Sequence, residues 1–351
     1  MRVGIVGLPN VGKSSLFNLL TGASARVDRY PFTTVDKNVG VVIVPDERLE
    51  TIGRLLKPEK LTPAHIDFVD IAGLVEGASR GEGLGNRFLG QIRESHIILH
   101  ILRNFDAPNA PHVFVDVDPD RDAAVVEAEL ALADLALCEA RLERLRKEPR
   151  TPDNVLLLEA LEPTTAALRE GFRLPALHAE QLAALRPLRL FVTLPTVYAV
   201  NCSDTEPADP ARFPEVAART SLLFSSALEE AATGFSDEER VELRRSLGLA
   251  PEGPAGITRR CFDELDLIRF YTVKGAESRA WAAPRGTTAV DAAALIHTDL
   301  AAGFIRAEVL NYSDLVAAGD FHLARDAGKA KLEGRNYVVQ DGDVLLIKFR
   351  N

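Results

Sequence analysis

The sequence predicts an α/β fold, in which a mostly parallel sheet covered by helices is interrupted by an α-helical hairpin and followed by a small α+β module. Three observations predict it. Residues 1–110 alternate strand-like and helix-like segments, which is typical of a parallel sheet. From about Asp122 the chain becomes rich in Ala, Leu, Glu and Arg, which indicates long helices. From about Asp266 strand patterns surround one helix pattern.

Size, charge and cysteine content restrict the function classes. The chain has 351 residues, enough for two or three domains. Its net charge of −10 gives no nucleic-acid signature over the whole molecule, and no DNA partner is expected. Cys138, Cys202 and Cys261 lie far apart, so neither a disulfide framework nor a zinc site is indicated. With no signal peptide and no apolar run near about 18 residues, we expect a cytoplasmic protein without a membrane partner.

The first element is a strand at residues 2–6, followed by a glycine-rich loop at residues 7–15 and a helix. This order is typical of a phosphate-binding loop, so the sequence predicts a P-loop nucleotide-binding fold. Lys13 would reach the β- and γ-phosphates, and the Ser14 hydroxyl would hold Mg²⁺. The plain alternative is an ordinary glycine-rich turn. The residues expected to bind the nucleotide here are Asn10, Val11, Gly12, Lys13, Ser14 and Ser15.

Strands are then expected at residues 39–44 and 65–70, and the second of them ends in an Asp-x-x-Gly motif. Asp70 would hold Mg²⁺, through water, and the Gly73 amide would sense the γ-phosphate. Thr34, between the first helix and the next strand, would coordinate Mg²⁺ when a triphosphate is bound, with Thr33 as the second choice. Without the other motifs, Thr34 reads as a plain loop threonine.

A helix at 86–94 and a strand at 97–102 precede the helical region. Leu135, Cys138, Leu142 and Leu145 follow a 3-4-3 spacing, which predicts a narrow apolar seam on a helix over 123–148. A second helical stretch follows over 153–185. We expect it to be broken by Pro163 and Pro175, and we expect the two stretches to form an antiparallel hairpin.

The tip of this hairpin is locally basic, with only Glu143 and Glu148 to offset its cations. Such a cluster could bind the phosphates of RNA, or it could be a solvated helix face. The cations are Arg141, Arg144, Arg146, Lys147 and Arg150.

A strand at 196–201 leads into Asn201-Cys202-Ser203-Asp204, where guanine-specific switches carry Asn-Lys-x-Asp. Asn201, Cys202 and Asp204 are therefore expected to bind the base, although Cys202 replaces the Lys that would pack on the ring. After a strand at 222–225, the backbone of Ser225, Ser226 and Ala227 would also touch the base. A helix at 237–247 with Ser236 as its N-cap completes this part.

The third region is expected to hold a strand at 267–273, a helix at 288–302, and a hairpin. In the hairpin, strands at 337–339 and 344–347 would flank the turn Gln340-Asp341-Gly342-Asp343.

Several motifs resemble those of the Obg-related YchF (Obg-like ATPase) family over essentially the whole chain. They lie at residues 7–14, 31–34, 70–74, 77–86, 279–281, 296–299 and 303–308. The resemblance implies a G domain with a helical insertion and a C-terminal TGS module of β-grasp type. The expected boundaries are 1–121 and 191–265 for the G domain, 122–190 for the insertion and 266–351 for the TGS domain.

The resemblance also implies site residues. Leu74 stands where other switches place a water-orienting Gln, and the family is thought to use a nearby His, which matches His112. Without the family match, His112 reads as a surface-loop histidine. Related switches bind K⁺ through the residue matching Asn10, so K⁺ is a second candidate ion. The family carries Asn-x-x-Glu, whereas this chain has Asp204 at the Glu position. The shorter carboxylate could regain contacts with guanine, so the family's preference for ATP does not carry over directly to this chain.

The motifs predict a Mg²⁺-dependent nucleoside triphosphatase that acts as a switch. The resemblance further implies that it prefers ATP, also accepts GTP, and binds ribosomes or ribosomal RNA. Catalysis would depend on His112, Lys13 and Gly73. The alternatives are a nucleotide-regulated binding or stress-response protein with incidental hydrolysis, and a GTPase that prefers GTP. A metabolic phosphotransferase on the same loop would need an acceptor pocket and a base, for which no motif is visible.

Overall fold

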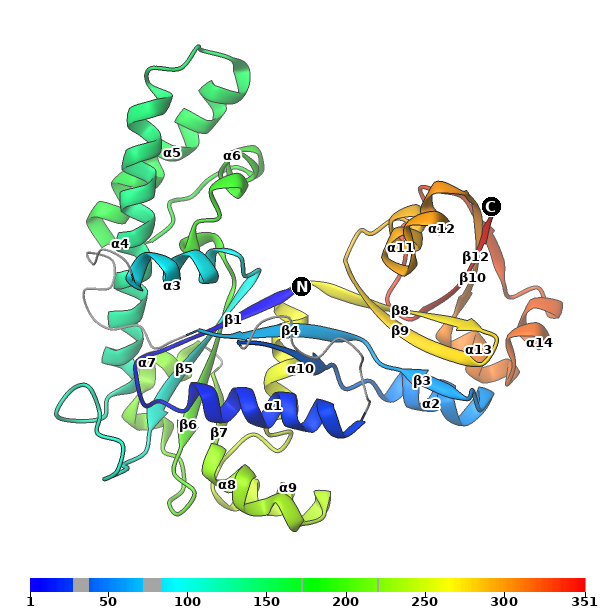
Figure 1. The fold of residues 1–351 in the computed structure, drawn as a ribbon, viewed down its shortest axis with the longest axis horizontal. Coiled ribbons are helices and arrows are strands. Elements are labelled where there is room, and N and C mark those ends of the chain that lie inside the picture. Colours follow the sequence, from blue (N-terminus) through cyan, green and yellow to red (C-terminus); the bar gives the residue numbers. More distant parts are fainter. Residues whose placement is uncertain (28–37, 72–83, 172, 220, 351) are drawn as a thin grey trace. The chain divides into compact units, whose positions relative to one another are not determined.

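The structure is a computed structural model that describes residues 1–27, 38–71, 84–171, 173–219 and 221–350 (Figure 1). The chain forms two compact units. The first comprises Met1–Gly40 and Asp67–Ile257, and the second comprises Val41–Ile66 and Thr258–Asn351. The expected boundaries assigned residues 41–66 to the nucleotide-binding domain, whereas residues 47–62 within this range pack with the C-terminal module.

The first unit is built on a six-stranded sheet. Its strands, in spatial order, are β2 (Val39–Ile43), β4 (His65–Asp70), β1 (Arg2–Val6), β5 (Ile97–Asn104), β6 (Thr196–Cys202) and β7 (Leu222–Phe224). The pairs β1–β4, β1–β5, β5–β6 and β6–β7 are parallel, as predicted. Every residue of β5 is buried, which explains why the strand is mostly apolar. Its pairing with β1 brings its C-terminal end beside the loop after β1.

The helices of this unit lie between and around the strands. They are α1 (Lys13–Val27), α3 (Leu84–Arg93), α4 (Pro119–Leu145), α5 (Pro152–Gly171), α6 (Ala179–Leu185), α7 (Pro214–Ala218), α8 (Ser226–Ala231) and α9 (Asp237–Ser246), with α10 (Pro254–Glu264) crossing into the second unit. Short 3₁₀ helices occur at 186–188, 191–193, 210–212 and 232–234. Ser236 caps α9 in a capping box with Glu239, as predicted.

The helical hairpin consists of α4 and α5, which run side by side away from the sheet in Figure 1. The predicted seam is confirmed, because Cys138, Leu142 and Leu145 are buried against Leu161 and Leu168 of α5. This apolar packing stabilises the hairpin more than its exposed charges do.

The predicted break at Pro163 is wrong, since α5 continues through it. Proline lacks the N–H that would bind the carbonyl of Glu159 four residues earlier. That carbonyl instead accepts a hydrogen bond from the side chain of Gln181, 3.4 Å away on α6. The external donor compensates for the lost helical bond, so the helix does not end there.

The second unit is a six-stranded sheet with helices on both faces. Its strands, in spatial order, are β11 (Lys331–Glu333), β10 (Phe304–Asn311), β12 (Asp343–Phe349), β8 (Leu267–Lys274), β9 (Glu277–Pro284) and β3 (Lys60–Thr62). Its remaining helices are α2 (Glu47–Leu56), α11 (Ala289–Ile296), α12 (Thr298–Ala302), α13 (Tyr312–Ala318) and α14 (Phe321–Asp326).

Two apolar clusters hold this unit together. One packs α11 against β8, β9, β10 and β12, and the other, on the opposite face, packs α2, α13 and α14. Figure 1 shows these helices on the two sides of the sheet. Arg48 of α2 also binds the Asp341 carboxylate at 2.8 and 3.2 Å, so the early segment is an integral part of the C-terminal module.

Two sequence predictions in this unit are wrong. The expected helix over 288–302 is interrupted at His297, whose extended backbone ends α11 and whose ring accepts the Asp299 amide at the start of α12. The expected strand at 337–339 makes only an isolated bridge, between Val338 and Thr288. Its turn is held by the Asp343 carboxylate, which accepts bonds from the Tyr337 hydroxyl and the Gln340 amide, both at 2.8 Å. In consequence β12 pairs with β10 and β8 instead. Among the described helices, none has the length and apolar content needed to cross a membrane.

Candidate functional site: a phosphate-binding loop and the segment bound to it

The loop between β1 and α1 has a backbone that requires its glycines. Gly7 and Gly12 have φ values of 151° and 97°, and Asn10 lies in the left-handed region with φ 63°. A Cβ on Gly7 would lie 2.4 Å from the Ile101 carbonyl oxygen. The loop therefore wraps closely around the end of β5, and the first turn of α1 begins directly after it at Lys13.

Lys13 points back into this loop. Its ammonium donates to the carbonyl oxygens of Gly7, at 3.0 Å, and Leu8, at 2.7 Å, and the residue is only 7% exposed. Burial lowers the pKa of Lys13 to about 8, while the negative charge of Asp70 opposes this shift. The hydrogen bonds of the ammonium are thus satisfied by neutral carbonyls. A phosphate would bind the charged group more strongly than these carbonyls do.

Ser14 and Asp70 meet beside the loop. The Ser14 hydroxyl donates to the Asp70 carboxylate at 2.8 Å, although 56 residues separate them in the sequence. A hydroxyl and a carboxylate at the start of α1 are hard oxygen ligands of the kind Mg²⁺ prefers, so the pair fits this ion. The other predicted switch residues, Thr33, Thr34 and Gly73, lie outside the described residues.

Asn201 braces the loop from the end of β6. Its amide nitrogen donates to the Val11 carbonyl at 3.1 Å and to the Ser226 hydroxyl at 3.0 Å. Its amide oxygen accepts the Ser226 backbone N–H at 3.0 Å, and Ser225 caps α8. A Cβ on Gly12 would lie 2.3 Å from the Asn201 nitrogen, so glycine is needed for this close contact.

The other predicted base-binding residues lie in different environments, some buried in the core and some exposed to solvent. Cys202 is 3% exposed and packs in the core with Leu102 and Val200, and burial raises the pKa of its thiol to about 11. Because adjacent strand residues face opposite sides, Asn201 faces the loop and Cys202 faces the core. Asp204 and Ala227 are exposed. Ser15 is half-buried in the first turn of α1.

Sequence reasoning missed Arg103, at the end of β5. This buried guanidinium donates to three backbone carbonyls: Phe105 at 2.9 Å, Ala110 at 2.7 Å and Asn10 at 3.1 Å. It also lies over the Phe105 ring, with the guanidinium carbon 4.4 Å from the centroid. The available signal was an arginine near the end of a mostly apolar strand, a position where charge is rare unless it is bound.

His112 lies two residues beyond Ala110, and its ring is bonded to the start of α4. Its Nε2 lies 2.7 Å from the Asp122 carboxylate, and its Nδ1 accepts the Phe114 N–H at 3.1 Å. With Nδ1 an acceptor, Nε2 carries the proton and donates to Asp122. Burial raises the pKa of Asp122, although Arg121 and His112 oppose that shift. The structure thus ties the backbone before His112 to the phosphate-binding loop and the ring itself to α4.

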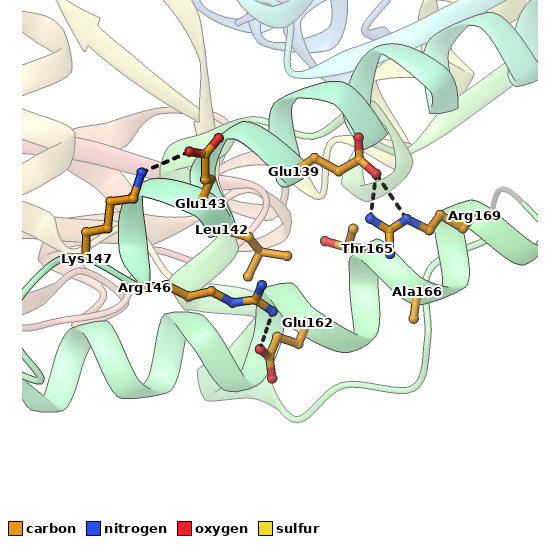
Figure 2. Close-up of a pocket in the computed structure, with 9 residues that line it drawn as sticks. All are labelled: Glu139, Leu142, Glu143, Arg146, Lys147, Glu162, Thr165, Ala166 and Arg169. Carbon is orange, nitrogen blue, oxygen red and sulfur yellow. Dashed lines mark hydrogen bonds and ion pairs between the residues drawn. The ribbon is translucent and has the colours of Figure 1, made fainter.

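The basic tip of the hairpin is largely paired with carboxylates. A groove of about 410 Å³ lies between α4 and α5. In it Arg146 binds Glu162 at 3.0 Å and Lys147 binds Glu143 at 2.9 Å (Figure 2). Arg141 forms a two-point pair with Glu148. Arg144 and Arg150 are exposed and make no ion pair within the part of the chain that the structure describes. The excess positive charge predicted for the tip is therefore much reduced.

Two family models match the chain. A model described as "50S ribosome-binding GTPase" matches residues 2–131. The YchF-GTPase_C model, described as a protein of unknown function, matches residues 267–350. The first match contains the phosphate-binding loop, Asp70, Arg103 and His112.

Similar proteins match along their full lengths. The "Ribosome-binding ATPase YchF" of Haemophilus influenzae is 41% identical over 358 residues, covering 99% of both chains. The protein of the same name from Bacillus subtilis is 39% identical over 364 residues, again covering 99% of both.

Solved structures agree. The Schizosaccharomyces pombe YchF GTPase has a TM-score of 0.85 and 32% identity, covering 99% of this chain and 97% of that one. A GTP-binding protein from Pyrococcus horikoshii has a TM-score of 0.62 at 20% identity, covering 100% of both chains, and supports the fold alone.

Proposed function

The chain belongs to the YchF family, and from this premise we propose that it is a Mg²⁺-dependent nucleoside triphosphatase that binds ribosomes. It hydrolyses the β–γ phosphoanhydride of ATP, and GTP to a lesser extent. The observation that carries the proposal is the loop itself: a buried ammonium on loop carbonyls beside a Ser14–Asp70 pair. We propose a cytoplasmic location, because the proposed partner is the ribosome.

The roles of the residues follow from their positions. The Lys13 ammonium exchanges the Gly7 and Leu8 carbonyls for phosphate oxygens, which are charged and bind it more strongly. The amides at the start of α1 bind the same phosphates. Ser14 and Asp70 would hold Mg²⁺, which would supply positive charge to neutralise the transferred phosphate. Thr34 and the Gly73 amide, which lie outside the described residues, would contact the ion and the γ-phosphate.

His112 orients the attacking water, because Leu74 offers no hydrogen-bonding group in place of the usual Gln. The ring must first leave Asp122, to which it is bonded at 2.7 Å. This bond favours slow hydrolysis in the unstimulated protein. The same His112–Asp122 bond is also consistent with the second candidate function, a nucleotide-regulated binding protein whose hydrolysis is incidental.

The decisive experiment measures phosphate release from ATP and GTP with and without ribosomal subunits, for the wild type and His112→Ala. We expect ribosomal subunits to accelerate hydrolysis, and His112→Ala to lower kcat by roughly 10²-fold or more with little change in nucleotide affinity. Hydrolysis that ribosomes leave unchanged would favour the binding-protein alternative. Full activity of His112→Ala would exclude the histidine.

Base selection depends on Asp204. Its exposed carboxylate is shorter than the family's Glu, so we expect ATP binding with measurable GTP binding. Asn201 acts on the base only indirectly, through the loop and α8. Titrating labelled ATP and GTP against the wild type and Asp204→Glu tests this role, and identical selectivity would show that position 204 does not contribute.

K⁺ at Asn10 is the remaining element of the proposal. The Asn10 amide nitrogen donates to the Pro111 carbonyl at 3.1 Å, which leaves its amide oxygen for an ion beside the phosphates. We expect faster turnover in K⁺ than in Na⁺ at equal ionic strength. Equal rates in the two salts would remove K⁺ from the mechanism.

A further inference from the structure

Arg103 holds together two pieces of chain that are far apart in sequence. Its Nη1 donates both to the Asn10 carbonyl, in the phosphate-binding loop, and to the Ala110 carbonyl, two residues before His112. Its Nε donates to the Phe105 carbonyl at the start of the same segment. One side chain therefore connects the loop to both ends of residues 105–110.

The contact is reinforced from the loop side. Asn10, held at a left-handed φ of 63°, donates through its side chain to the Pro111 carbonyl at 3.1 Å. The backbone carbonyl of Asn10 thus accepts from Arg103, and its side chain binds Pro111 directly. The carbonyls of two consecutive residues, Ala110 and Pro111, are fixed immediately before the histidine.

Arg103 is also rigidly placed. It is 1% exposed, it belongs to a strand that is buried along its whole length, and it lies over the Phe105 ring. A buried guanidinium is costly unless hydrogen bonds satisfy it, and here backbone carbonyls do so without cancelling its charge. The group is therefore a fixed clamp and not a mobile surface cation.

We propose that Arg103 is a positioning residue that holds segment 105–111 on the phosphate-binding loop, so that the His112 ring can turn from Asp122 to the reacting phosphate on a fixed backbone. The inference rests on the proposed role of His112. When the ring leaves Asp122, the bonds of Arg103 and Asn10 still hold the backbone before it. Arg103 acts through His112, because its guanidinium is buried and bonded to backbone carbonyls.

The test compares Arg103→Lys with a matched control. Lysine keeps the charge but lacks the planar fork that reaches three carbonyls. We expect kcat for ATP hydrolysis to fall roughly 10- to 100-fold while the Kd of labelled ATP changes by less than about threefold. The control is Arg93→Lys. Arg93 also lies over a ring, that of Phe191 at 4.2 Å, and also binds backbone carbonyls, at the base of the hairpin. The Arg93→Lys substitution should leave kcat unchanged.

A double-mutant cycle separates positioning from general damage. In a His112→Ala background, Arg103→Lys should cause no further loss of kcat, because the two residues act as one unit. Additive losses would overturn the proposal, as would a His112→Ala enzyme with full activity. If the wild type hydrolyses neither ATP nor GTP, the proposed function itself is wrong.

Hydrogen exchange provides a readout independent of activity. The amides of the non-proline residues of 105–111 should exchange faster in Arg103→Lys than in the wild type, while those of α5 should not change. Unchanged exchange in 105–111 would overturn the proposal. Phe105→Leu, which removes the ring under the guanidinium but keeps the carbonyl bonds, should give a smaller loss of kcat and covers the case in which Arg103→Lys folds poorly.

Discussion

The phosphate-binding loop carries one buried cation and the tip of the helical hairpin carries several, and the two regions satisfy their cations differently. Lys13 binds backbone carbonyls, whereas Arg146 and Lys147 bind carboxylates. A neutral carbonyl satisfies the hydrogen bonds of a cation but leaves its positive charge uncompensated, whereas a carboxylate also neutralises that charge. The comparison shows that the number of cations in a stretch of sequence does not predict an anion site, because what matters is the group to which each cation is already bound.

The largest expected effect is that of Lys13→Ala. Losing one buried, charge-assisted contact to the phosphates should weaken ATP and GTP binding by about 100-fold, which corresponds to roughly 3 kcal/mol. Titration with labelled nucleotides measures it. Lys147→Ala, which removes a carboxylate-bound lysine from the hairpin, should leave both affinities unchanged. If the two variants behaved alike, the comparison between loop and hairpin would fail.

The next effect is a pH dependence of nucleotide affinity. Burial lowers the pKa of free Lys13 to about 8, and a bound triphosphate would raise it again. Below about pH 8 the ammonium is protonated in both states, so Kd should be constant. Above it the free protein loses a proton that the complex keeps, so Kd should rise by up to about tenfold per pH unit. Binding titrations at several pH values test this, and the Lys13→Ala profile should be flat.

The smallest effects are expected in the hairpin. Arg146→Gln should change the free energy of unfolding by only about 0–1 kcal/mol, because exposed ion pairs contribute little. It should also leave the salt dependence of ribosome binding unchanged. Arg150→Gln removes an exposed cation, and if the tip contacts RNA phosphates it should reduce the salt slope by about one. A larger loss for Arg146→Gln than for Arg150→Gln would contradict the view that pairing neutralises the tip.

The sequence predicted the parts of the site that depend on backbone pattern. A strand, a glycine loop and a helix placed Lys13 and Ser14, and a second strand end placed Asp70 beside them. Strand alternation could also have separated Asn201 from Cys202. The partners of Arg103 could not be predicted, because they are backbone carbonyls, which leave no trace in side-chain identity.

The sequence predicted the elements that depend on local spacing. It missed those whose structure depends on a residue far away in the sequence. The seam of α4 and the cap of α9 follow from spacing alone. The continuity of α5 through Pro163 depends on Gln181, which is 18 residues away. The sheet position of β12 depends on pairing with β8 and β10 instead of with its neighbour in sequence. Such non-local contacts are the ones that periodicity cannot reveal.

The inclusion of Val41–Ile66 in the second unit has a consequence for biogenesis. Leu49 and Ile52 leave the ribosome early, yet they share a core with Leu310 and Phe321, which are made near the end of synthesis. The module therefore cannot complete its interior until almost the whole protein has been translated. A gene fragment starting at residue 266 would lack α2 and β3, and would emerge with part of its interior open to solvent.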